Sequence, residues 1–147
     1  MERNAHITDI EALSHEAGAF ASALSPNAQT ATLITLSGEL GAGKTAFVQA
    51  VARSLSVEET VSSPTFVLEK IYRLPDGKHF KHLIHIDAYR LDSGADLAAL
   101  GFDELMRDAE NLILLEWPEK VSDRLPEPAV RIALTALPDG SRILVYG

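Results

Sequence analysis

The sequence predicts an α/β fold of one domain, spanning residues 1–147, with a mixed parallel and antiparallel sheet flanked by helices. A glycine-rich loop at residues 38–45 stands between a strand-like apolar run and a run with helical spacing, which is the pattern of a parallel β–α unit. Two Pro-Asp-Gly turns, at residues 75–77 and 138–140, each separate two strand-like runs and therefore add antiparallel strands. A chain of 147 residues is large enough to bury its own core.

The first part of the chain is expected to hold a helix, a strand and a second helix. The pattern Thr8-Asp-Ile-Glu11 is a capping box, and Pro26 ends the helix that follows it. The apolar residues of this helix recur on one face: Ile10, Leu13, Ala17, Phe20 and Leu24. A polar linker at residues 25–30 leads into a strand over residues 31–37. Helical spacing returns after the glycine-rich loop, at Phe47, Val48, Val51, Ala52 and Leu55.

The middle of the chain predicts a loop and then a hairpin. Residues 58–65 hold turn formers without periodicity, and Pro64 imposes an extended conformation on the residue before it. A strand should therefore run from about Thr65 to Tyr72 and, after the first Pro-Asp-Gly turn, return antiparallel from Phe80 to Asp87. In the returning strand the alternation puts Leu83, His85 and Asp87 on one face, opposite to His82.

The last part predicts two short helices and three strands. Gly101 separates the helices, which are expected at Ser93–Leu100 and Phe102–Asp108. Asn111–Glu116 is a short apolar run typical of a buried strand, and Pro118 stops it. Strands at Val130–Ala136 and Arg142–Tyr146 flank the second turn and close the domain.

The composition excludes several classes of function. Thirteen Lys and Arg stand against 21 Asp and Glu, a net charge of −8, and the basic residues are scattered, so little direct nucleic-acid binding is expected. The absence of cysteine excludes disulfides, thiolate metal sites and cysteine nucleophiles. No apolar run is long enough to span a membrane and the N-terminus does not resemble a signal peptide, so we expect a cytoplasmic protein without membrane contact.

Residues 38–45, Gly-Glu-Leu-Gly-Ala-Gly-Lys-Thr, match the phosphate-loop (Walker A) pattern at every fixed position. Gly38, Gly41 and Gly43 lack a Cβ atom, so the backbone can turn consecutive N–H groups toward an anionic phosphate. Lys44 can place a positive charge on the terminal phosphates, and Thr45 can offer its hydroxyl to Mg²⁺. The alternative, a glycine-rich turn without a ligand, does not account for Lys44 and Thr45. The motif predicts a single P-loop NTPase domain.

Acidic side chains at strand ends are candidates to complete the site. Glu116 ends the most apolar run in the chain, and Asp87 ends the preceding predicted strand. In a phosphate-loop protein the strand ends are where nucleotide and metal lie, although either acid can also be an ordinary exposed carboxylate. Thr65 is placed like a switch threonine that senses the terminal phosphate through Mg²⁺, or it simply begins a strand. Trp117 is expected to be a packing residue beside the site.

Four segments together resemble one family. They are Gly-Glu-Leu-Gly-Ala-Gly-Lys-Thr, Ser-Ser-Pro-Thr-Phe, His-Ile-Asp-Ala-Tyr-Arg-Leu and Leu-Glu-Trp-Pro-Glu. In order and spacing they resemble the TsaE (YjeE) family, the bacterial ATPases of tRNA threonylcarbamoyladenosine biosynthesis, over roughly residues 8–146. One departure is Ser56, where family members often carry glycine; it concerns a turn rather than the chemistry.

The resemblance implies a role for each matching residue. The phosphates would be bound by Leu40, Gly41, Ala42, Gly43, Lys44 and Thr45. Thr45 and Glu116 would hold Mg²⁺, and Asp87 would be a catalytic or water-positioning acid. Thr65 would belong to the first switch, and Glu11 would match a position near the nucleotide.

The resemblance also implies partners. The family acts with two subunits of an actin-like ATPase fold, and together they transfer threonylcarbamoyl onto the adenosine beside the anticodon of ANN-decoding tRNAs. Hydrolysis of ATP is then expected to be slow in the isolated chain, because only Arg90 is at hand as a transition-state cation. Two alternatives stay open: a P-loop kinase of a small metabolite, and a guanine-nucleotide binding module. The lack of an Asn-Lys-x-Asp sequence argues for adenine.

Overall fold

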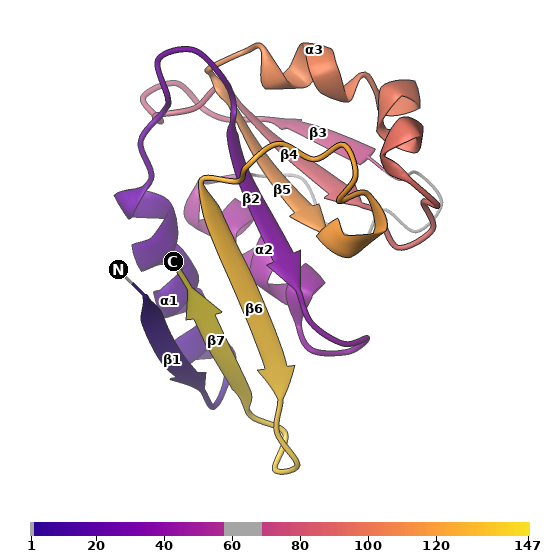
Figure 1. Ribbon diagram of the computed structural model, residues 1–147. Coiled ribbons are helices and arrows are strands. Elements are labelled where there is room, and N and C mark those ends of the chain that lie inside the picture. The colour runs from indigo at the N-terminus through magenta and orange to yellow at the C-terminus, as the bar shows by residue number, and fades with distance from the viewer. Residues whose placement is uncertain (1, 58–68) are drawn as a thin grey trace.

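Seven strands form one mixed sheet in the computed structural model, which describes residues 2–57 and 69–147 (Figure 1). Their spatial order is β1-β7-β6-β2-β5-β4-β3. The strands are β1 (Arg3–Ile7), β2 (Thr32–Ser37), β3 (Glu69–Arg73), β4 (His82–Asp87), β5 (Asn111–Glu116), β6 (Val130–Ala136) and β7 (Arg142–Tyr146). The predicted mixed α/β fold is confirmed.

The centre of the sheet is parallel and its margins are antiparallel. Strand β2 pairs in parallel with β5 and β6, and β4 pairs in parallel with β5. The antiparallel pairs are β3 with β4, β6 with β7, and β1 with β7. Because parallel strands end at the same edge of a sheet, the segments that follow β2, β4 and β5 come together there.

Helices cover both faces of the sheet. Helices α1 (Ile10–Ala23) and α2 (Lys44–Ser54) bury Phe20 and Phe47 against one face, and these two rings meet edge to face at 5.6 Å. The 3₁₀ helix η1 (Gly94–Leu100) and helix α3 (Phe102–Met106) pack on the other face, and a second 3₁₀ turn, η2 (Pro118–Lys120), follows β5 (Figure 1). Gly101, with φ of 70°, separates η1 from α3, as the sequence predicts.

The N-terminal segment differs from the prediction in three ways. Strand β1 was not expected, because its residues are mostly exposed and only its pairing with β7 orders it. The cap of α1 is Asp9, whose carboxylate accepts a hydrogen bond from the Ala12 N–H at 2.8 Å, instead of a Thr8 capping box. Ile10 is 73% exposed, so it does not belong to the predicted buried face.

The other predicted elements agree with the structure to within a few residues. Strand β4 begins at His82 instead of Phe80, and α3 ends at Met106. The described part of the first hairpin strand is Glu69–Arg73. The predicted loop at 58–65 and the predicted start of that strand lie outside the described residues. In the described residues, no helix combines the length and the apolar character needed to cross a membrane.

Helix α2 ends in a Schellman motif that holds Ser56 in a left-handed conformation. The Val57 N–H donates to the Ala52 carbonyl, and the Ser56 N–H donates to the Arg53 carbonyl, both at 3.0 Å. This arrangement requires positive φ at the residue after the cap, and Ser56 has φ of 64°. The position where the sequence departs from the family's usual glycine is therefore one where glycine is the favoured residue.

Replacing Ser56 with glycine should stabilise the protein by up to ~1 kcal/mol. The left-handed conformation costs an ordinary residue about 1–2 kcal/mol, and the greater freedom of glycine in the unfolded chain offsets about 0.4–1 kcal/mol of that gain. Chemical denaturation of the two proteins measures the difference. Ser54→Gly, inside the helix, is the matched control and should destabilise. A Ser56→Gly protein no more stable than the parent would contradict the strain at this position.

Candidate functional site

The phosphate loop connects β2 to α2 at the edge where the parallel strands end. Gly38, Gly41 and Gly43 all have positive φ, of 144°, 82° and 106°. A Cβ atom on Gly38 would lie 2.4 Å from the Leu134 carbonyl oxygen, so β6 permits no side chain there. Gly43 is the N-terminal cap of α2, and no side chain caps that helix end. The N–H groups of its first turn are therefore open to an anion.

The ammonium group of Lys44 lies within the loop. Its Nζ donates to the carbonyls of Gly38 and Glu39, at 2.5 and 2.9 Å, and lies 4.1 Å from the centre of the Trp117 ring. Burial lowers the pKa of Lys44, and the carboxylates of Glu116, Glu119 and Asp87 oppose that shift. A buried cation held largely by neutral carbonyls and an aromatic ring is a strong attractor for phosphate oxygens.

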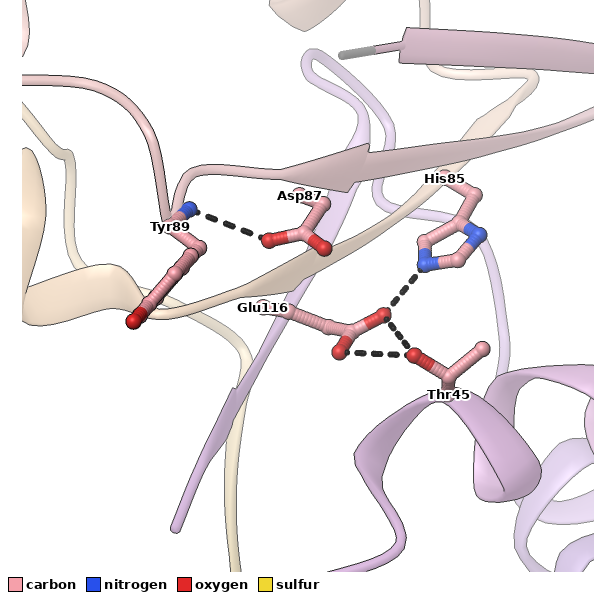
Figure 2. A network of polar contacts seen from close by, with 5 residues as sticks. All are labelled: Thr45, His85, Asp87, Tyr89 and Glu116. Atoms are coloured by element: carbon pink, nitrogen blue, oxygen red, sulfur yellow. Dashed lines mark hydrogen bonds and ion pairs between the residues drawn. The ribbon is translucent and has the colours of Figure 1, made fainter. Parts of the chain in front are cut away.

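Three elements meet at the buried carboxylate of Glu116 (Figure 2). The Thr45 hydroxyl, on α2, lies 3.1 Å from Oε1 and 3.0 Å from Oε2 of Glu116, which ends β5. The imidazole Nε2 of His85, on β4, lies 2.5 Å from Oε2. Glu116 is 2% exposed and His85 is fully buried. The contacts hold the carboxylate beside the hydroxyl of the phosphate loop.

Asp87 lies next to Glu116 at the end of the neighbouring strand. The two residues are register partners between β4 and β5. Asp87 is half-buried and accepts a hydrogen bond from the Tyr89 N–H at 3.0 Å (Figure 2). Burial, with a contribution from the charge of Glu116, raises the pKa of Asp87; the Tyr89 N–H, His85 and Lys44 oppose the shift. Asp87 thus has the raised proton affinity of a carboxylate suited to accept a proton.

The phosphate loop and the residues at the ends of β4 and β5 line a cavity of about 260 Å³. Its walls are Leu40, Gly41, Gly43, Lys44, Thr45, Ala46, Asp87, Tyr89, Glu116 and Trp117. Lys44 is the one basic residue among these lining residues. The cavity therefore combines one cation, a hydroxyl and two carboxylates around the phosphate loop.

A second cavity, of about 160 Å³, adjoins the first and shares Gly43 and Ala46 with it. It lies between the start of α1 and the β6–β7 hairpin, and its other lining residues are Ile7, Thr8, Asp9, Ile10, Leu13, Leu134, Gly140 and Arg142. Arg142 Nη2 donates to the Gly41 carbonyl at 3.3 Å, which ties the hairpin to the phosphate loop. This mostly apolar hollow is a suitable place for a nucleotide base.

The structure brings together most of the residues that the sequence selected. Lys44, Thr45, Asp87 and Glu116 line one cavity, whereas Thr65 lies outside the described residues. Ala42 is 1% exposed and its N–H donates to the Glu39 carbonyl at 3.0 Å, so its predicted contact with the phosphates stays a prediction. Glu11 is exposed in the first turn of α1 and is not among the residues found to line the second cavity. Its role near the nucleotide stays a prediction.

The sequence analysis did not select His85, and it interpreted Trp117 chiefly as a packing residue beside the site. The only available signal for His85 was its position on the same strand face as Asp87, two residues earlier. Trp117 has φ of 62°, an uncommon conformation for an aromatic residue, and its ring packs 4.8 Å from that of Tyr89 as well as against Lys44. It is thus part of the cavity wall rather than of the core alone.

The donors in the first cavity fit a magnesium ion. Thr45 and Glu116 offer a hydroxyl and a carboxylate within hydrogen-bond distance of each other. Mg²⁺ prefers hard oxygen ligands, and it is commonly held by one or two protein groups together with water and substrate phosphates. The described residues contain no cluster of three or more His, Cys, Asp and Glu arranged for a metal.

Comparisons with known proteins agree on one family. The family model "Threonylcarbamoyl adenosine biosynthesis protein TsaE" matches residues 11–144, a range that includes the phosphate loop, Asp87 and Glu116. The chain is 39% identical over 113 residues to the tRNA threonylcarbamoyladenosine biosynthesis protein TsaE of Treponema pallidum, covering 76% of this chain and 78% of the relative. It is 38% identical over 128 residues to the protein of the same name from Rickettsia bellii, and this match covers 86% of this chain and 82% of the relative.

A solved structure supports the fold independently. The crystal structure of Bacillus subtilis YdiB resembles this chain with a TM-score of 0.77 and 25% sequence identity. The superposition covers 99% of this chain and 84% of that chain. The parallel centre and antiparallel margins described above therefore belong to a known arrangement.

Lys44→Ala should weaken binding of Mg²⁺-ATP by about 10–150-fold, the equivalent of the ~1.5–3 kcal/mol that a hydrogen bond to a charged group contributes. Lys44 is the one cation that lines the first cavity. Isothermal titration calorimetry measures the affinity, and circular dichroism checks the fold. Lys78→Ala, at an exposed position of the first hairpin turn, is the control and should bind as the parent does. Parental affinity in a folded Lys44→Ala protein would disprove the site.

Neutralising Glu116 and neutralising Asp87 should impair different properties, the first the Mg²⁺ dependence of binding and the second the rate of hydrolysis. If Glu116 holds Mg²⁺, Glu116→Ala should raise the Mg²⁺ concentration that nucleotide binding requires. If Asp87 accepts the proton of the attacking water, Asp87→Asn should bind ATP normally but hydrolyse it about 10²–10⁴-fold more slowly. Magnesium titrations and single-turnover phosphate release separate the two effects, with exposed Asp103→Asn as the control. If the metal dependence changes with Asp87 instead, the two roles are reversed.

Proposed function

This chain belongs to the TsaE family and has a role in tRNA threonylcarbamoyladenosine modification, and we propose that it fulfils this role as a Mg²⁺-dependent P-loop ATPase. The modified base is the adenosine next to the anticodon in ANN-decoding tRNAs. One observation carries the ATPase proposal: Lys44, Thr45, Asp87 and Glu116 converge on one cavity at the phosphate loop. The family match by itself names the pathway but not the chemistry.

The two adjoining cavities suggest how ATP is bound. The triphosphate occupies the first cavity, where the N–H groups of the loop and of the first turn of α2 face the phosphate oxygens. The base occupies the second cavity, whose apolar wall includes Ile7, Leu13 and Leu134. Gly43 and Ala46 line both cavities, so a ligand whose triphosphate lies in the first can place its base in the second.

We assign different roles in ATP hydrolysis to the polar residues of the first cavity. Thr45 and Glu116 would hold Mg²⁺, which when bound neutralises charge on the phosphates. Lys44 exchanges its carbonyl partners for phosphate oxygens. Asp87, with its raised pKa, is placed to orient a water molecule and to accept its proton. Lys44 and Thr45 lie at the start of α2, whereas Asp87 and Glu116 end β4 and β5.

Transition-state stabilisation is the part that this site lacks. Phosphoryl transfer usually needs a cation on the transferring group in addition to the loop lysine, and an arginine finger contributes roughly 10³–10⁵ in rate. Among the described residues, Lys44 is the only basic one that lines the first cavity, and Arg90 is exposed after the end of β4. We infer that a partner completes the site. The partners would be the two actin-like-fold ATPase-family subunits of the cytoplasmic modification complex, which would also carry most of the tRNA contact.

Phosphate release by the isolated protein should be slow and should rise at least tenfold when the two purified partner subunits are added, because they supply the missing cation. The same mixture, given tRNA, ATP and a preformed threonylcarbamoyl donor, should restore the modified adenosine, measured by mass spectrometry of digested tRNA. Lys44→Ala is the control and should restore nothing. Fast hydrolysis alone, unchanged by the partners, would show a complete catalytic site in this chain and would contradict the proposal.

A further inference from the structure

We propose that His85 is a positioning residue, which fixes the Glu116 carboxylate in the orientation that binds Mg²⁺. The inference rests on the proposed function, because it concerns the metal that Thr45 and Glu116 would hold. It assigns a role to a side chain that neither the phosphate-loop motif nor the strand-end acids account for.

The geometry links His85 to the metal donors through one atom. His85 is fully buried on β4, and its Nε2 lies 2.5 Å from Oε2 of Glu116. An ionised carboxylate can only accept hydrogen bonds, so Nε2 carries the hydrogen and donates it. The Thr45 hydroxyl approaches the same carboxylate from α2 (Figure 2). Oε2 is thus engaged by the imidazole, and Oε1 is left facing only the hydroxyl.

The surroundings of His85 favour this role over a purely structural one. Its strand neighbour on the same face, Leu83, is packed in the core beneath α1 and α2. The other ring nitrogen, Nδ1, is buried without a hydrogen-bond partner among the described residues. If the imidazole served only for packing, both ring nitrogens would be buried without hydrogen bonds, and their desolvation would cost free energy. Glu116 is the one polar partner that the described structure gives it.

Without the imidazole, the Glu116 carboxylate would keep only the Thr45 hydroxyl as its partner in the described structure. The Glu116 side chain could then rotate about its own bonds, and the metal donors would no longer be preorganised. Hydrogen-bond partners that orient metal ligands typically change metal affinity by about 10–100-fold when they are removed. The expected effect of losing His85 is therefore on Mg²⁺ rather than on the nucleotide itself.

Two substitutions at His85 separate hydrogen bonding from packing. His85→Phe keeps an aromatic ring but has no donor, whereas His85→Gln can place an amide N–H near the position of Nε2. The control is His82→Phe, on the same strand but on its opposite face. Binding of a fluorescent ADP analogue is measured at increasing Mg²⁺ and also in EDTA, and thermal unfolding shows that each variant is folded.

His85→Phe should raise the half-saturating Mg²⁺ concentration about 10–100-fold. His85→Gln should stay within about threefold of the parent, affinity in EDTA should be unchanged in both, and His82→Phe should match the parent. A His85→Phe protein with parental Mg²⁺ dependence would overturn the inference, and so would an equal loss in both variants. If His85→Phe does not fold, His85→Leu, which also lacks a donor, can be compared with His85→Gln in its place. Nucleotide binding by the parent that ignores Mg²⁺ would instead contradict the proposed function.

Discussion

The buried carboxylate of Glu116 is the contact on which the site depends. It joins β5, through its own backbone, to α2 through Thr45 and to β4 through His85. A carboxylate that is 2% exposed is costly unless polar groups surround it, so its partners cannot be lost separately without penalty. This requirement holds the start of α2, and with it the phosphate loop, against the ends of two parallel strands. Contacts of the candidate site therefore also hold α2 to the sheet.

Backbone conformation places the remaining groups around that carboxylate. Gly38 passes so close to β6 that any side chain would meet the Leu134 carbonyl, and this approach sets the start of the loop. At the other side, the left-handed conformation of Trp117 turns the chain directly after Glu116 and brings its ring over Lys44. Backbone strain of this kind clusters at functional sites, although Ser56 shows that a helix end can also carry it. Here it closes the cavity wall beside the loop lysine.

The antiparallel margin of the sheet contributes the second cavity. Strand β1 pairs with β7, and Arg3 on β1 forms a two-bond ion pair with the buried Glu16 of α1. Tyr146 donates to the same carboxylate at 2.9 Å. Arg3, with help from Tyr146, holds the pKa of Glu16 below its usual value. These contacts fasten α1 beside the β6–β7 hairpin, and the apolar hollow next to the phosphate loop lies between them.

The sequence alone determined the elements whose signal is local. The phosphate loop, the buried strand ending at Glu116, both hairpins and the break at Gly101 follow from spacing, turn residues and apolar runs within a few residues of one another. The candidate acids Asp87 and Glu116 were found for the same reason, since parallel strand ends are recognisable one strand at a time. Only the tertiary structure decided what depends on distant partners. Strand β1 is ordered by its pairing with β7, the exposure of Ile10 follows from how α1 packs, and His85 contacts Glu116 only because β4 lies beside β5. The sequence around a histidine in an apolar strand does not indicate its hydrogen-bond partner, because that partner is 31 residues away in the chain.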